Sequence, residues 1–445
     1  MLRFSAGLLG GVLTLGAVAA CSNDSPPDPA SAGAAGTWSA SGGASGLPGV
    51  AGSSSGGVGV SGSGGSNPGS AGAVATAGAG TGAGGVSGAG GSATTQGGAS
   101  SAGSSGVSGG GAAGSGGAAG SAGTAGIGGV AGSGGAAPTY PAPSSQHRAI
   151  GTHDPSLLRV ADTFYLFGTG GLLGERSSTN LSQWANAGNV FSALPAWIKT
   201  ALGQSISDLW APDISFVNGT YRLYYSGSTF GSNHSVIGLA TNTTLDSKNA
   251  AYKWVDQGLV IESNAAGASN DWNAIDPNAV LDTAGNWWLV FGSFWSGIKL
   301  RRLDTATGKL STADTMLYGL ASHSGGIEAP SIIAHNGYYY LFVSYDACCK
   351  GVDSTYRTMV GRSTAITGPY TDASGKGMLQ GNAVQLLAKD GRYIGPGGGT
   401  AFQDGSQYFY VYHYYDRDMN GASQLMLRPI NWKNDWPELG TPLWQ

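Results

Sequence analysis

A short aromatic segment recurs five times in the C-terminal part of this 445-residue chain, and this repeat constrains the fold more than any other feature of the sequence. The five copies occupy residues 164–168, 222–226, 288–292, 340–344 and 409–413. Their ends lie 58, 66, 52 and 69 residues apart, about 61 on average. Turn residues such as Asn218-Gly219 and Asn336-Gly337 precede most copies, which is typical of many short strands rather than helices.

An acidic residue and a proline form a second repeat, in phase with the first. In four copies the proline lies 13 to 15 residues before the end of the aromatic segment. The pairs are Asp154-Pro155, Pro212-Asp213, Asp276-Pro277 and Glu328-Ala329-Pro330, and the fifth copy has Gly395-Pro396-Gly397 without an acid. A repeat of this length predicts a β-propeller with radial, four-stranded blades. We therefore expect residues 144–445 to form an all-β, five-bladed β-propeller; the alternative is a β-sandwich with coincidental spacing.

The phased acids are candidates for chemistry, because the innermost strands of all blades of a propeller face one channel. Equivalent positions converge there, so at least three of the four carboxylates are expected to meet at one end of the channel. Carboxylates gathered without basic partners raise each other's pKa, so that one stays protonated while another is ionised, as glycosidic bond cleavage requires. The alternative is that the acids cap strands or bind a cation. We favour that alternative for Asp213, which follows its proline where the other acids precede theirs.

Several motifs, in chain order, closely resemble the endo-1,5-α-L-arabinanases of glycoside hydrolase family 43. They are HDPS at 153–156, WAPD at 210–213, NAIDPN at 273–278, FGSFWSG at 291–297, IEAP at 327–330, DACCKG at 346–351 and GRS at 361–363. The resemblance covers residues 147 to about 430. It implies a five-bladed propeller that hydrolyses arabinan, a pectic polysaccharide, with inversion of configuration.

The resemblance also implies roles for individual residues. Asp154 is the expected general base, Glu328 the general acid, and Asp276 the acid that raises the pKa of Glu328 and orients the sugar. The expected sugar-contacting positions are Asp154, Gly231, Asn273, Ala274, Ile275, Asp276, Ser293, Phe294 and Trp295. For Phe294 and Trp295 the alternative is ordinary blade core.

Three further features near these motifs call for interpretation. His413 ends the fifth aromatic segment, where the other copies have Gly or Ser. A lone His is usually a polar residue whose hydrogen bonds are satisfied within the fold. The resemblance instead implies a bound ion, calcium, that His413 contacts through water. Cys348 and Cys349 could form a strained ring or remain two thiols. The Gly-rich run at 395–400 stands where related proteins often place a His, so the shape of the cleft near the fifth blade stays open.

The N-terminal third predicts export. Residues 1–20 have the n-region, apolar h-region and small C-terminal residues of a signal peptide, and Cys21 follows as in a bacterial lipobox, so we expect lipidation of Cys21; the alternative is ordinary signal cleavage. Residues 41–140 contain 39 Gly and no charged side chain, and the segment 21–143 is therefore expected to be a disordered tether, or else an insertion without a role.

Composition and charge limit the expected binding partners, but more than one function remains compatible with the sequence. No apolar run of 18 residues follows residue 20, so membrane contact is expected only through a lipid anchor, and a net charge of −4 excludes an electrostatic nucleic-acid binder. We expect an exported, monomeric hydrolase, at the cell surface or secreted. The alternatives are a glycan-binding propeller without activity, which would need no proton donor, and an exo-acting arabinosidase or xylosidase of the same family.

Overall fold

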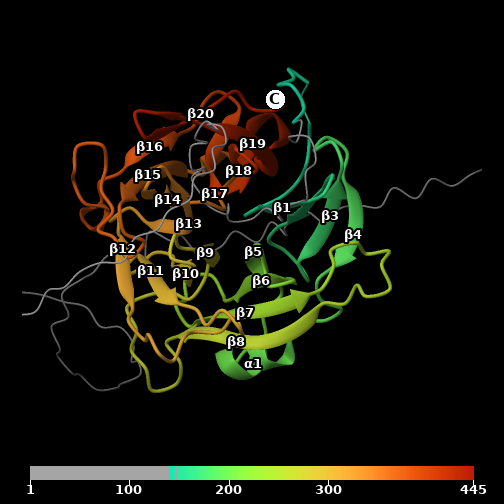
Figure 1. Cartoon of the computed structure of the whole chain (residues 1–445), viewed down its shortest axis with the longest axis vertical. Coiled ribbons are helices and arrows are strands. Elements are labelled where there is room, and N and C mark those ends of the chain that lie inside the picture. The colour runs from blue at the N-terminus through green and yellow to red at the C-terminus, as the bar shows by residue number, and fades with distance from the viewer. Residues whose placement is uncertain (1–139, 147, 445) are drawn as a thin grey trace, which may run out of the picture. The chain divides into compact units, whose positions relative to one another are not determined.

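The computed structural model describes residues 140–146 and 148–444. The predicted signal peptide, Cys21 and most of the predicted tether lie outside the described residues. Within the described part, the strands form five four-stranded antiparallel sheets that radiate from a common axis (Figure 1). The predicted five-bladed β-propeller is therefore confirmed.

The blades follow one another along the chain, each with its first strand innermost. Blade 1 contains β1 (Ser156–Val160), β2 (Thr163–Phe167), β3 (Gly174–Ser178) and β4 (Ala185–Asn189). Blade 2 contains β5 (Trp210–Val217), β6 (Thr220–Gly227), β7 (Ser235–Asn242) and β8 (Val255–Ser263). Blade 3 contains β9 (Asn278–Leu281), β10 (Trp287–Phe291), β11 (Ile298–Arg302) and β12 (Tyr318–Ala321).

The C-terminal half completes the ring. Blade 4 contains β13 (Ile327–His335), β14 (Tyr338–Tyr345), β15 (Arg357–Ser363) and β16 (Val384–Leu387). Blade 5 contains β17 (Tyr393–Asp404), β18 (Gln407–Asp416), β19 (Ala422–Lys433) and β20 (Trp436–Leu439). Among the described residues, helical structure is confined to α1 (Ala196–Leu202) and to short 3-10 turns at Gly351–Asp353, Met378–Gln380 and Arg417–Met419.

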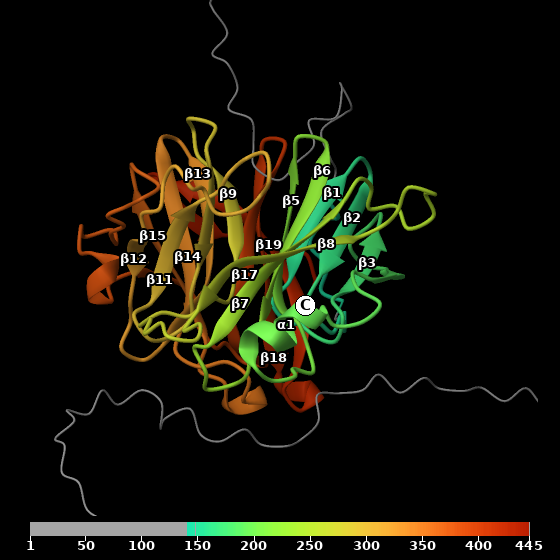
Figure 2. The same ribbon diagram turned by 90° about the horizontal axis from the view of Figure 1, so that it is seen from below.

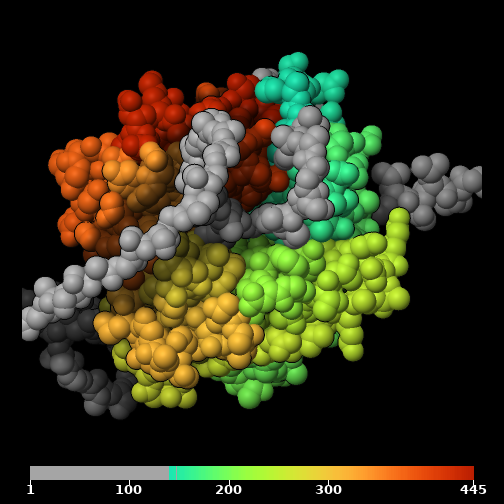
Figure 3. All heavy atoms as spheres, in the orientation of Figure 1, coloured from blue at the N-terminus to red at the C-terminus, as the bar shows by residue number. Residues whose placement is uncertain are grey.

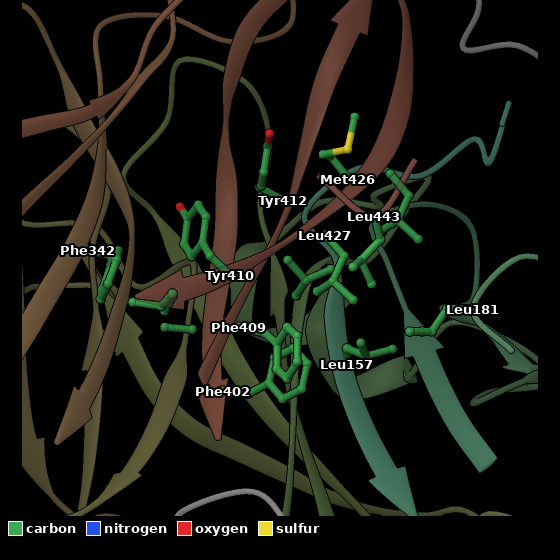
Figure 4. Close-up of a cluster of buried hydrophobic side chains, with 14 of the residues drawn as sticks. Leu157, Leu181, Phe342, Phe402, Phe409, Tyr410, Tyr412, Met426, Leu427 and Leu443 are labelled. Carbon is green, nitrogen blue, oxygen red and sulfur yellow. The ribbon is translucent and has the colours of Figure 1, made fainter. Parts of the chain in front are cut away.

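The recurring aromatic segments form the second strand of each blade, β2, β6, β10, β14 and β18. Their side chains are mostly buried because both faces of a blade pack against neighbouring blades. The hydrophobic cores accordingly lie between blades, and the one in Figure 4 joins Leu157 of blade 1, Phe342 of blade 4 and Phe409 of blade 5. Figure 2 shows neighbouring blades standing side by side, and the spheres of Figure 3 show them in direct contact.

The chain preceding β1 runs along blade 5. Gly151 forms a bridge with Gln424, and the N–H of Leu425 donates to the carbonyl of Ile150 at 2.8 Å. Further upstream, the ring of Tyr140 stacks on Phe409 with centroids 3.9 Å apart. Among the described residues, contacts with the propeller thus already include Tyr140, four residues before the predicted boundary at 144.

A ring of hydrogen bonds joins each blade to the next near the axis. In four of the five steps, a side chain at the end of a second strand accepts a hydrogen bond from the backbone N–H at the entry to the next inner strand. The acceptors are Thr169, Ser226, Ser344 and His413, and the donors are Ala211, Asp276, Gly398 and Asp154, at 2.7, 3.0, 2.9 and 3.1 Å. Blade 3 has Gly292 at this point, and the N–H of Ala329 donates to Asp276 at 3.0 Å instead.

A second ring lies two residues further along each inner strand. There the side chains of Ser156, Asp213, Asn278 and Ser331 accept from the N–H groups of Ile214, Ala279, Ile332 and Ala401, at 3.1, 2.8, 3.0 and 3.0 Å. Asp213 therefore bonds blade 2 to blade 3, as the alternative interpretation held, and Ala211 is the true counterpart of Asp154.

The same rings correct the alignment of the fifth copy. Gly398 donates to Ser344 as the other entry residues do, and Thr400 stands where Ser156 and Ser331 stand. The predicted equivalent, Gly395-Pro396-Gly397, lies too early in the chain, because β17 is irregular on both sides of Gly397 and holds extra residues there.

We expect Asp213→Ala to lower the free energy of unfolding by roughly 2–4 kcal/mol, because it leaves two buried donors without an acceptor. Those donors are the N–H of Ala279 and the amide of Asn278, at 2.8 and 2.9 Å. Asp213→Ser should cost less, since serine serves at this position in two other blades. Urea unfolding monitored by tryptophan fluorescence measures both variants, and an alanine variant as stable as the wild type would contradict this role.

Within residues 140–146 and 148–444, none of the helices has the length and apolar character needed to span a membrane.

Candidate active site

The three predicted catalytic acids come from the entries to three inner strands. Asp154 precedes β1, Asp276 precedes β9, and Glu328 lies at the start of β13. Asp154 and Asp276 adopt left-handed backbone conformations, with φ of 45° and 56°, which aspartate tolerates better than most residues. Both acids line a cavity on the propeller axis, together with Gly398. The sequence prediction that phased acids converge on the axis holds for this pair, and Glu328 directly precedes another lining residue, Ala329.

Asp154 is held as an ionised carboxylate. Its Oδ2 lies 2.7 Å from Nδ1 of His153 and accepts a hydrogen bond from Oγ1 of Thr169 at 2.6 Å. Burial favours the protonated acid, but His153, His413 and Thr169 outweigh it and bring the pKa of Asp154 to about 2. Burial also opposes a charge on His153, yet the Asp154 carboxylate raises the pKa of His153 above its usual value.

Glu328 is buried and held from both sides. Oε2 accepts a hydrogen bond from Ser293 at 2.7 Å, and Oε1 accepts a short one from the hydroxyl of Tyr356. Burial raises the pKa of Glu328, the two hydroxyls oppose that rise, and the negative charge of Asp154 adds to it, so the net shift is upward. A carboxyl with a raised pKa can carry a proton to a leaving group near neutral pH.

Asp276 is coupled to Glu328 through the backbone. Its Oδ2 accepts from the N–H of Ala329, the residue after Glu328, at 3.0 Å. Burial raises the pKa of Asp276, and the charges of Glu328 and Asp154 raise it further. Each of these carboxyls, when ionised, opposes ionisation of the other.

The predicted sugar-contacting stretch 273–275 lies directly beside Asp276 and is largely buried. Asn273 is almost fully buried, and its Oδ1, itself buried, has no hydrogen-bond partner among the described residues. Ala274 is completely buried and its N–H donates to Ser263 at 2.9 Å, so its side chain supports its neighbours. Ile275 retains slight exposure.

The predicted aromatic contacts lie at the surface. Trp295 is 44% exposed and Phe294 is half-buried, both in left-handed turns, so the alternative of blade core does not apply to Trp295. Ser293, a predicted sugar contact, donates a hydrogen bond to Glu328 at 2.7 Å. Gly231 has a φ of 75° beside Phe230, which is 66% exposed and whose ring lies 5.2 Å from that of Trp210.

His413 is completely buried against Asp154, the predicted base. Its ring stacks on His153 with centroids 3.7 Å apart, and its Nδ1 accepts the N–H of Asp154. Burial and the charge of His153 lower the pKa of His413, so the ring is neutral and its proton lies on Nε2. The adjacent Gly398 is needed here, because a Cβ at this position would lie 2.5 Å from Oδ1 of Asp154. The Gly-rich run thus leaves space for the side chain of Asp154.

Sequence reasoning gave no role to three residues that contact the predicted catalytic acids: His153, which the motif at 153–156 contains, Thr169 and Tyr356. Thr169 bonds Asp154, and Tyr356 bonds Glu328. Thr169 follows the first aromatic segment directly, where Ser226 and Ser344 end their copies, so a shift of one residue in the alignment would have found it. Tyr356 lies in a loop outside every repeat, and no sequence signal marks it.

Comparison with known proteins agrees with this geometry. Residues 149–437 match the profile of Glycosyl hydrolases family 43. A Bacillus subtilis protein named extracellular endo-α-(1→5)-L-arabinanase 1 is 42% identical over 290 residues, which cover 64% of this chain and 86% of the relative. The chain therefore spans most of the length of that relative.

Two solved structures are similar along nearly their whole length. An exo-1,5-α-L-arabinanase from a bovine ruminal metagenomic library is 41% identical, with a TM-score of 0.63, and the match covers 67% of this chain and 99% of that one. A Cellvibrio cellulosa α-L-arabinanase complexed with arabinohexaose is 35% identical, with a TM-score of 0.63 and coverage of 66% and 96%. With its propeller, its clustered acids and a profile match over residues 149–437, this chain belongs to glycoside hydrolase family 43.

Proposed function

We propose that this protein is an endo-1,5-α-L-arabinanase that cleaves internal α-1,5-linked L-arabinofuranosyl bonds of arabinan with inversion of configuration. The observation that carries the proposal is the division of labour among the acids. The pKa of Asp154 is lowered and that of Glu328 is raised. Glycoside hydrolysis by inversion needs one ionised carboxylate as the base and one protonated carboxyl as the acid, and these two shifts favour that combination. The named activities of the relatives supply the substrate class.

Asp154 is proposed to take a proton from the attacking water. A carboxylate held between His153 and Thr169 keeps one oxygen, Oδ1, for that water, because both neighbours bond Oδ2. Glu328 then protonates the leaving oxygen, with Ser293 and Tyr356 keeping its carboxyl group oriented. Asp276 and Glu328 oppose each other's ionisation, so a negative charge on Asp276, whose Oδ2 accepts the N–H of Ala329, would keep the proton on Glu328.

The predicted calcium fits His413 only through water. Nε2 of His413 is buried without a hydrogen-bond partner among the described residues, and it carries the ring proton, so it donates to a water rather than binding a cation directly. A bound calcium would supply positive charge that lowers the pKa of its water ligands. His413 would hold one such water, while its Nδ1 holds the backbone of Asp154.

Product analysis tests the endo activity. Linear arabinan, debranched arabinan and xylan are each digested, and the products are sized over time. We expect mixed short oligosaccharides from both arabinans early in the reaction and none from xylan. Exclusive release of one small product from the chain ends would instead support the exo alternative, which the ruminal exo-1,5-α-L-arabinanase favours at 41% identity. Absence of hydrolysis of all three polymers would support a glycan-binding propeller.

Export and anchoring are part of the proposal. The signal-like N-terminus, Cys21 and the extracellular name of the Bacillus subtilis relative support secretion with a lipid on Cys21, so that the tether holds the propeller away from the membrane. Metabolic labelling with a fatty-acid analogue should mark the wild type and spare Cys21→Ser. Equal labelling of both proteins would rule out the anchor.

We expect Asp276→Asn to move the basic limb of the pH–rate profile to lower pH. Removing a negative charge beside Glu328 lowers the pKa of Glu328, so this acid loses its proton at a lower pH. The acid limb of the profile is an internal control and should stay in place. It reports the pKa of Asp154, which His153, His413 and Thr169 lower. A basic limb that stays in place, with normal folding by circular dichroism, would contradict the assigned role of Asp276.

A further inference from the structure

A disulfide closes a loop beside the catalytic acids. Cys348 and Cys349 are joined to each other, and they lie in the segment 346–356 that connects β14 to β15. Cys349 has a left-handed backbone conformation, with a φ of 66°, and both cysteines are partly buried. The sequence had left the choice between two thiols and a ring open.

The loop reaches the general base through two side chains. The N–H of Cys349 donates to the hydroxyl of Tyr415 at 2.7 Å, and this hydroxyl lies 2.7 Å from Nε2 of His153. His153 in turn bonds Asp154 at 2.7 Å. Sγ of Cys349 also lies 3.8 Å from Nε2 of His153. The disulfide is therefore the outer end of a continuous chain of contacts that ends on Asp154.

The same loop reaches the general acid. The N–H groups of Thr355 and Tyr356 both donate to the carbonyl of Ala347, at 2.9 and 3.2 Å, directly beside the disulfide. Tyr356, which ends the loop, donates its hydroxyl to Glu328. One loop thus contacts the acid directly, through Tyr356, and the base indirectly, through Tyr415 and His153.

The ring gives this loop a backbone that a reduced pair would not keep. A disulfide between adjacent residues restricts the torsions of both, and it holds Cys349 in a conformation that is unfavourable for residues other than glycine. Opening the ring restores that freedom, so the N–H of Cys349 would no longer be directed at Tyr415.

We propose that the Cys348–Cys349 disulfide positions the base through Tyr415 and His153 and the acid through Tyr356, so that reducing it lowers turnover. This inference rests on the proposed function. The cysteines are positioning residues, since neither touches the reacting atoms. Misplacing catalytic groups by about 1 Å can cost on the order of 10²-fold in rate, which sets the expected scale.

The test compares the oxidised and reduced full-length chain. A water-soluble trialkylphosphine reduces the disulfide to two thiols and becomes the phosphine oxide, taking its oxygen from water. We expect a gain of two titratable thiols, a fall in kcat on arabinan of roughly 10–100-fold, and little change in KM. Circular dichroism and a thermal melt show whether the reduced protein is still folded at the assay temperature.

Three variants separate positioning from general damage. Cys348→Ser/Cys349→Ser should have a low kcat that the phosphine does not change. Tyr415→Phe keeps the disulfide but removes one link, so reduction should lower its kcat by a smaller factor than in the wild type. Tyr414→Phe is the matched control, because its hydroxyl is buried without a hydrogen-bond partner among the described residues; it should respond to the phosphine as the wild type does.

Two results would overturn the proposal: unchanged kcat after two thiols have appeared, or a loss of activity that follows the loss of folded protein. An oxidised chain that does not hydrolyse arabinan would contradict the proposed function instead. The imidazole NMR signals of His153 test the positioning proposal independently of activity. They must shift on reduction of the wild type and stay unchanged when the phosphine is added to the double serine variant.

Discussion

Asp154→Ala is expected to lower kcat by a factor of about 10²–10⁴, the usual worth of general acid–base catalysis, on arabinan and on a nitrophenyl arabinofuranoside alike. Every substrate needs the attacking water to lose its proton, whatever the leaving group. The backbone contact with His413 survives the substitution, because the N–H of residue 154 is the donor. Initial rates on the two substrates measure the effect.

A small anion should restore part of this activity. Azide can enter the space that the Asp154 carboxylate vacates and attack the sugar without a base, and the glycosyl azide should have inverted configuration. The matched control is Asp162→Ala, an almost fully exposed carboxylate of the same blade, which should keep wild-type rates. An azide product of retained configuration would contradict the inverting mechanism.

Glu328→Ala should separate the two substrates. Arabinan has a poor leaving group that needs a proton, so its hydrolysis should fall by about 10²–10⁴. A nitrophenolate leaves without protonation, so the nitrophenyl substrate should retain far more of its wild-type rate. The ratio of the two losses is the measurement, with Glu438→Ala, an exposed glutamate paired with Lys433, as the control.

The roles of the two acids follow from a comparison of Asp154→Ala with Glu328→Ala. For each variant the loss of rate on arabinan is divided by the loss on the nitrophenyl substrate. If Glu328→Ala loses the nitrophenyl substrate as severely as Asp154→Ala does, the assignment of acid and base is wrong. Glu328→Ala leaves the hydroxyls of Ser293 and Tyr356 without their acceptor, so this variant could lose stability as well as activity. The melting temperature of each variant shows whether it is folded at the assay temperature.

The sequence alone determined the architecture and the pair of acids on the axis. Aromatic segments at regular intervals can bury both faces only when sheets stack around an axis, so their period predicts the number of blades. Asp154 and Asp276 precede their prolines at the same phase, and equivalent positions of a propeller meet at its centre. The family resemblance supplied the roles of these residues and of Glu328.

Only the tertiary structure decided which phased residues share an environment. Asp213 lies one position beyond its proline, which places it in the second ring of hydrogen bonds rather than on the axial cavity. The irregular β17 moved the fifth copy to Gly398. Tyr356, Tyr415 and the disulfide reach the acids from loops, where spacing carries no periodic signal. A repeat fixes positions along strands, whereas contacts between loops depend on how the blades close around the axis.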